Sequence, residues 1–226
     1  YIAYMTKEQL IAKFRKFIET YCYEDLLKNI KQGKQALIVD YSNFSKYDYK
    51  LAEILLDSPE EHIAVFEEAI QDFDVPGAKY PIRVRFTNLP ASLFVSIRNV
   101  RSKHLGKMIA IEGLIRQASD IRPKITLATF NCPSCGTKIL VEQKGDKFSE
   151  PERCKCGRKG KFTLVDKKLA DIQRLVVEEA PDSMGGEHPK RLPVLLSEDL
   201  LSPELEKKRN PGNKVSVVGI LCEVPL

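Results

Sequence analysis

The sequence predicts an α+β multidomain protein: an N-terminal helical bundle, then a small β-barrel, with a zinc-binding ribbon inserted in the barrel. Apolar residues recur at helical spacing up to about residue 74. Short β-rich segments separated by turns fill the rest of the chain, and two pairs of cysteines lie between two of them. The length of 226 residues allows two or three small domains.

Two helix starts can be located in the first part, which we expect to be helical from residue 1 to about residue 74. Thr6 and Gln9 have the spacing of a capping box, and Ser58-Pro59 combines an N-cap residue with proline at the first helical position. One apolar stripe then follows at Ile63, Phe66, Ile70 and Phe73. The stripe predicts packing inside a bundle; a helix that binds a partner is the alternative.

The segment Val75–Pro81 predicts a linker between the helical part and the β-rich part, because its prolines and glycine end a helix. We assign 1–80 to the helical bundle with its linker, 81–130 plus 164–226 to the barrel, and 131–163 to the inserted ribbon. The expected strands are 82–86, 107–115, 124–130, 161–165, 172–177, 192–196 and 214–224.

The four clustered cysteines, Cys132, Cys135, Cys154 and Cys156, predict a structural Zn²⁺ site. Two tight pairs separated by 18 residues match the ribbon type of zinc site, and a glycine follows each pair. The second pair has only one intervening residue, which makes its turn tighter. Disulfides and unbound thiols are the alternatives. Cys22 and Cys222 have no cysteine nearby and are expected to be small buried residues.

Composition gives weaker evidence on function. The net charge of +5 is only mildly basic, but acidic residues dominate 57–74 and basic residues dominate 98–124. No apolar segment approaches the roughly 20 residues of a membrane span, and no signal peptide is visible. We therefore expect an intracellular protein of the cytoplasm or nucleoid with no membrane partner.

Several motifs then occur in one order: Asn88-Leu89-Pro90, Gly113–Pro123 before the first cysteine pair, Asp171-Ile172-Gln173, Gly185–Lys190, Leu196–Leu200, and Pro211–Val215. In this order and over nearly the whole chain, they resemble the N-terminal region of MCM (minichromosome maintenance) replicative DNA helicases of the archaeal kind. The resemblance implies an OB-fold β-barrel.

The resemblance also implies partners: a homo-hexameric ring, which can pair as a double hexamer, around single-stranded DNA, with double-stranded DNA in the channel, and other replication-initiation factors. The sequence has no Gly-x-x-x-x-Gly-Lys-Ser/Thr loop, so ATP and Mg²⁺ belong to an absent motor domain and the chain is not an enzyme on its own. We expect it to end before the motor and before a basic hairpin.

The resemblance places DNA-binding positions at Arg122 and Lys190, whereas two further positions of the family motif fall on Gln117 and Val176. Arg174 lies two residues before Val176 and shares its face of a strand, so it can substitute. Arg116, Lys124 and Arg191 are further candidates. The alternative for each is a solvated surface charge.

Two other functions are alternatives to a helicase module. An independent single-strand nucleic-acid-binding protein could also combine a barrel with a zinc element, and a motor domain encoded downstream would exclude it. A zinc hydrolase is disfavoured because four cysteines leave no open position for water. The three histidines, His62, His104 and His188, lie in no catalytic arrangement.

Overall fold

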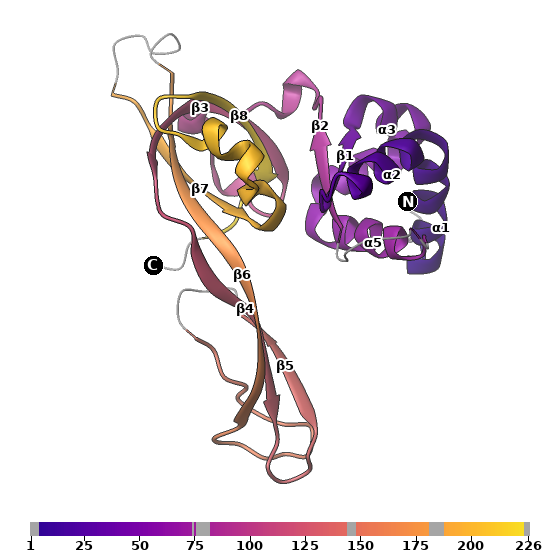
Figure 1. Cartoon of the computed structure of the whole chain (residues 1–226), viewed down its shortest axis with the longest axis vertical. Helices are drawn as coiled ribbons and strands as arrows, with labels where there is room; N and C mark the ends of the chain where they lie inside the picture. The colour runs from indigo at the N-terminus through magenta and orange to yellow at the C-terminus, as the bar shows by residue number, and fades with distance from the viewer. Residues whose placement is uncertain (1–4, 74, 76–81, 144–147, 181–187, 224–226) are drawn as a thin grey trace. The chain divides into compact units, whose positions relative to one another are not determined.

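A computed structural model describes residues 5–73, 75, 82–143, 148–180 and 188–223 of the chain (Figure 1). The chain forms two compact units. The first contains Tyr1–Ile115, Val177–Leu192 and Gly212–Val224, and the second contains Arg116–Val176, Pro193–Pro211 and Pro225–Leu226. Two long strands, β3 (Met108–Ala118) and β6 (Thr163–Glu178), each run through both units.

The first unit begins with helices, as predicted. They are α1 (Lys7–Phe17), a π-helical turn (Ile18–Cys22), α2 (Tyr23–Lys31), α3 (Tyr41–Tyr47), α4 (Tyr49–Asp57) and α5 (Pro59–Gln71). The predicted capping box is confirmed: the Gln9 amide donates to Thr6 Oγ1 at 3.4 Å, and the Thr6 amide donates to Gln9 Oε1 at 3.2 Å. The second predicted start is also confirmed, since α5 begins at Pro59 after Ser58.

The prediction that residues 1 to about 74 are all helical is wrong at β1 (Ala36–Asp40). This strand pairs in parallel with β2 (Arg83–Thr87), with Ala36 opposite Arg83 and Asp40 opposite Thr87. Leu37-Ile38-Val39 are β-branched or bulky residues that favour a strand, but the partner strand is more than 40 residues away. The predicted linker 75–81 lies outside the described residues, apart from the buried Val75.

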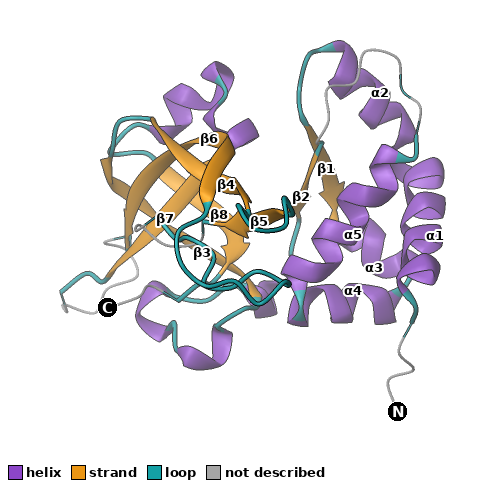
Figure 2. Cartoon of the chain, turned by 90° about the horizontal axis from the view of Figure 1, so that it is seen from below, coloured by secondary structure: helices purple, strands orange, loops and turns teal. Residues whose placement is uncertain are grey.

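The helices of the first unit pack together (Figure 2), and aromatic rings form the centre of their core. The rings of Phe14 and Phe66 stack at 4.4 Å between centroids, and Phe17 meets Phe44 edge to face at 5.0 Å. All four side chains are fully buried. Met108 of β3 belongs to the same buried cluster, so the helices and the start of the sheet share one core.

A six-stranded sheet forms the rest of the fold, in the order β5-β4-β6-β3-β8, with β7 also paired to β6. The strands not yet given are β4 (Arg122–Asn131), β5 (Lys138–Glu142), β7 (Arg191–Ser197) and β8 (Lys214–Ile220). The strands predicted at 161–165 and 172–177 form one strand, β6, and β5 was not predicted. Figure 1 shows β4, β5 and β6 running side by side.

Two isolated cysteines differ from one another. Cys22 is buried in the helical core as predicted, and burial raises the pKa of its thiol to about 11. Cys222 is exposed, so the prediction that it is buried is wrong. It follows β8, where the chain has already left the sheet.

Candidate functional site

The four predicted ligand cysteines converge beside the end of β4 and the start of β6. Their sulfur atoms all lie within 4.8 Å of one another. Cys132 Sγ is 3.7 Å from Cys156 Sγ, and Cys135 Sγ is 3.5 Å from Cys154 Sγ. A disulfide needs about 2.05 Å, whereas thiolates at tetrahedral corners about 2.3 Å from a Zn²⁺ ion lie about 3.8 Å apart. The geometry therefore fits a metal ion better than disulfides.

Both cysteine turns use the same backbone geometry despite their different lengths. Gly136 and Gly157 have positive φ values of 70° and 88°, a region that favours glycine. The Gly136 amide donates to the Cys132 carbonyl at 2.8 Å, and the Gly157 amide donates to the Cys154 carbonyl at 2.9 Å. The bond of the first turn joins residues four positions apart and that of the second joins residues three apart, so the second turn is shorter by the one residue that its cysteine pair lacks.

The core around the cysteines is small. Its buried residues are Ala128, Phe130, Cys132, Cys154 and Phe162. Two of these five are cysteines, so apolar burial alone offers little stability to this end of the sheet. Arg158 Nη1 also donates to Ser134 Oγ at 2.6 Å, which joins the two cysteine turns.

Three of the predicted DNA-binding residues share one face of the β4–β6 pair. Arg122 lies opposite Ile172 and Lys124 opposite Ala170 in the antiparallel register. Residues directly opposite one another point to the same face, and so do residues two apart on a strand. Arg174, two residues beyond Ile172, therefore lies on the face of Arg122 and Lys124. Arg122 and Arg174 are exposed, and Lys124 is half-buried.

The alternation on β6 supports the substitution expected at Arg174. Leu175 and Val177 are buried, whereas Arg174 is exposed and Val176 is half-buried. Arg174 and Val176 thus lie on the outer face together. On β3, Arg116 and Gln117 are both exposed.

Lys190 and Arg191 lie in the other compact unit, at the start of β7. The Lys190 amide donates to Glu179 Oε2 at 3.1 Å, and its carbonyl accepts from the Glu179 amide at 3.1 Å, which fixes its backbone while its side chain remains exposed. Arg191 Nε donates to Glu178 Oε2 at 2.6 Å. A phosphate at Arg191 would compete with this carboxylate.

Glu179 is a buried charged residue that no pattern in the sequence marks. It directly follows β6 and is only 4% exposed. Arg98 donates to it from Nε at 3.1 Å and Nη2 at 3.0 Å, and Ser96 Oγ donates at 3.0 Å. The Arg98 hydrogen bonds are the main cause that lowers the pKa of Glu179 to about 2. Arg98 is 81 residues away, so no local pattern signals the pair.

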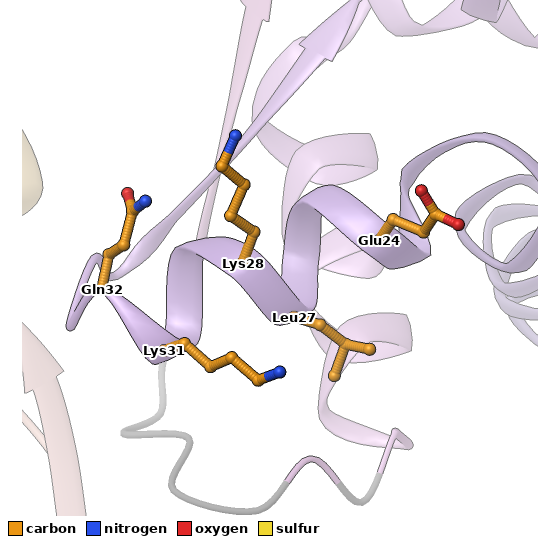
Figure 3. Close-up of a pocket in the computed structure, with 5 residues that line it drawn as sticks. All are labelled: Glu24, Leu27, Lys28, Lys31 and Gln32. Carbon is orange, nitrogen blue, oxygen red and sulfur yellow. The ribbon is translucent and has the colours of Figure 1, made fainter.

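An open hollow beside α2 offers no catalytic arrangement. It is lined by Glu24, Leu27, Lys28, Lys31 and Gln32, which all belong to this helix or its end. Lys28 and Gln32 extend to one side of the helix and Leu27 to the other (Figure 3), so the polar groups do not converge. Within the described part of the chain, no helix combines the length and the apolar character that crossing a membrane requires.

Helices at the N-terminus, an OB-like sheet and a four-cysteine cluster define a class of α+β modules with a candidate metal centre. Two protein-family models that match the sequence show which family of this class the chain belongs to. The MCM N-terminal domain matches residues 11–88, and the MCM OB domain matches residues 96–225. The chain belongs to the MCM family.

Individual relatives agree with this assignment. The chain is 28% identical to the minichromosome maintenance protein MCM of Saccharolobus solfataricus over an alignment of 203 positions that covers 83% of this chain and 29% of the relative. It is 30% identical to the DNA replication licensing factor MCM2 of Oryza sativa subsp. japonica over an alignment of 231 positions that covers 92% of this chain and 23% of the relative. The chain therefore spans about a quarter of the length of these relatives.

A solved structure supports the fold over nearly the whole length. The crystal structure of the N-terminal domain of an archaeal MCM superposes with a TM-score of 0.73 at 28% identity, covering 96% of this chain and 89% of that chain.

Proposed function

We propose that this chain is the single-stranded-DNA-binding and ring-forming N-terminal module of a hexameric replicative helicase. Its membership of the MCM family and the names of its relatives, which include DNA replication licensing factors, support a role in DNA replication. In this proposal, ATP hydrolysis and Mg²⁺ binding belong to the motor domain of the helicase. The chain itself spans about a quarter of the length of these relatives.

The observation that supports DNA binding most directly is the shared face of Arg122, Lys124 and Arg174. Three cationic side chains on neighbouring strands can each approach a phosphate of one extended strand. The sequence contains no tryptophan, and most of its buried aromatic rings lie in the helical core. Binding therefore depends on phosphates and discriminates little between bases. Lys190, Arg116 and Arg191 are further DNA-binding residues in this proposal.

The metal in this proposal is Zn²⁺, held by Cys132, Cys135, Cys154 and Cys156. Four thiolates complete a tetrahedral shell, so the ion stabilises structure and leaves no position for a reacting water. The proposed domains are a helical part (1–80), an OB barrel (81–130 plus 164–226) and a metal ribbon (131–163). The first strand of the second range, β2, pairs with β1 of the helical part and not with the six-stranded sheet.

The partners in this proposal follow from the family: a homo-hexamer, a second hexamer, single-stranded DNA, double-stranded DNA in the channel, and replication-initiation factors. None of these partners is a membrane.

Binding of a fluorescently labelled single strand of about 20 nucleotides tests the proposal. Arg122→Ala should weaken binding about fivefold, or ~1 kcal/mol, for a thymine strand and a mixed strand alike. Lys50→Ala removes an exposed charge from α4 and serves as the control, with affinity unchanged. Equal affinity of Arg122→Ala and the wild-type chain would reject this site.

A further inference from the structure

The turn 119–121 joins β3 to β4, directly before Arg122, and Ser119 bonds this turn to β6. The Ser119 amide donates to the Arg174 carbonyl at 2.9 Å, and the Arg174 amide donates to Ser119 Oγ at 3.0 Å. Gln173 Nε2 donates to the Ser119 carbonyl at 2.8 Å. Ser119 is exposed, so these bonds, rather than apolar packing, determine where the turn lies.

The Gln173 amide is itself held by a buried arginine. Arg209 is 7% exposed, and its Nη1 donates to Gln173 Oε1 at 2.9 Å. The rest of the guanidinium donates to backbone carbonyls, those of Leu201 and Ser202 at 3.3 Å and Leu205 at 3.4 Å. Arg209 thus fastens the connection between β7 and β8 to the side chain of Gln173.

The direction of the Gln173 amide follows from this contact. A guanidinium group has donors only, so Gln173 must turn its oxygen towards Arg209. Its NH₂ group then points the other way, where the Ser119 carbonyl accepts. The alternative amide orientation would place two donors against each other at Arg209 and two oxygens against each other at Ser119, so it is excluded.

We propose that Gln173, oriented by Arg209, is a positioning residue that sets the spacing of Arg122 and Arg174 for DNA phosphates. The inference rests on the proposed function. Arg122 begins β4 three residues after Ser119, and Arg174 adjoins Gln173 and is bonded to Ser119 through both its amide and its carbonyl. Loss of the Gln173 bond leaves the turn held only by these two bonds and by the pairing of Arg122 with Ile172, so the separation of the two cationic side chains is less narrowly fixed.

Gln173→Met tests this inference, because methionine has a similar length, adds no charge and cannot bond to Ser119. Arg209 retains its three carbonyl acceptors, so the connection should stay folded. Hydrogen exchange of peptides covering 117–121 and 172–176 in the zinc-loaded 226-residue chain should become faster. Gln71→Met, the same substitution at an exposed position of α5 outside both peptides, is the matched control and should leave exchange and binding unchanged.

Affinity for a labelled thymine strand then shows whether Gln173 positions the cationic side chains or only stabilises the fold. Gln173→Met should bind about fivefold more weakly, and adding Gln173→Met to Arg122→Ala should weaken binding by less than twofold, because both changes remove the same contact. Lys190→Ala with Gln173→Met should instead multiply the two losses. Wild-type affinity in Gln173→Met, or full additivity with Arg122→Ala, would overturn the inference alone. Absence of binding by the wild-type chain would overturn the proposed function as well.

Discussion

Glu179 shows how a buried residue can stay charged in this fold. Its carboxylate accepts from Ser96, Arg98 and the Lys190 backbone, and Arg98 brings a full opposite charge. These bonds join the residues before β3, the end of β6 and the start of β7. A buried pair of this kind is costly to break on one side only, because the remaining charge has no partner.

The lowered pKa of Glu179 predicts how this contact depends on pH. A carboxyl whose pKa is lowered on folding stabilises the folded state above its unfolded pKa, and the stabilisation disappears as the pH falls towards the folded pKa. For Glu179 this window runs from about 4.5 down to about 2. The contribution is up to roughly 3 kcal/mol.

Glu179→Gln makes this dependence measurable, because the amide does not titrate. The difference in the free energy of unfolding between wild type and Glu179→Gln, measured in urea, should be largest at pH 6 and shrink at pH 3. Loss of zinc in acid affects both proteins and cancels in the difference. A difference that stays constant over this range would contradict the role of the charged carboxylate.

Among the helices and strands, those that local sequence patterns determine are easier to predict than those that depend on a distant partner. The capping box at Thr6, the start of α5 and most strands follow from local patterns. β1 does not, because its partner β2 is remote. β6 was divided in two because Asp166-Lys167-Lys168, all exposed, interrupt its apolar pattern.

The residues of the candidate site also fall into those that local patterns predict and those that they do not. The spacing of the cysteines predicts the cluster that the sulfur positions show. The resemblance placed a DNA-binding position at Arg122, and alternation along a strand identified Arg174 as a substitute. Glu179 with Arg98, and Gln173 with Arg209, are tertiary contacts between polar residues far apart, and no periodicity marks them.

The proposed metal ribbon gives a prediction for the element as a whole. Chelation of zinc, or Cys154→Ser, should disorder residues 131–163, because a core this small cannot offset the lost ligand bonds. Hydrogen exchange should rise throughout these residues, while β3 and α1 keep their protection. A metal-free protein with unchanged exchange in the ribbon would contradict the proposal, as would two disulfides by mass.

Gly113 gives a prediction about β3. A Cβ atom at this position would lie 2.4 Å from the Glu178 carbonyl oxygen and 2.7 Å from Val177 Cγ1. Backbone cannot yield as a flexible side chain can, so Gly113→Ala should destabilise the protein by about 1–3 kcal/mol. Gly219→Ala on β8 is the control, because nothing lies within 4 Å of the Cβ atom there. Equal melting temperatures for the two variants would contradict the packing of β3 on β6.

At the scale of the whole molecule, the surface charge of α5 bears on the proposed ring. Glu60 and Glu61 begin this helix, and Glu67 and Glu68 follow on it, paired with Arg83 and Lys7. No lysine or arginine lies in the helix, so the charge of its own side chains is acidic. DNA phosphates would be repelled by such a surface.

We therefore expect α5 on the outside of the hexamer. Electron microscopy of the assembled ring with DNA bound should place α5 away from the channel and the Arg122 face towards it. A ring with α5 along the channel would contradict this arrangement.

A salt titration tests the central claim most directly. This claim is that a single strand binds mainly through its phosphates, at the face that Arg122, Lys124 and Arg174 share. If Arg122, Arg174, Lys190 and one further residue each neutralise a phosphate, the slope of log K against log salt should be about −3, from roughly −0.7 per contact. Arg122→Ala should make the slope shallower by about 0.7, and the control Lys50→Ala should leave it unchanged. An unchanged slope in folded Arg122→Ala would mean that DNA follows another path across this protein.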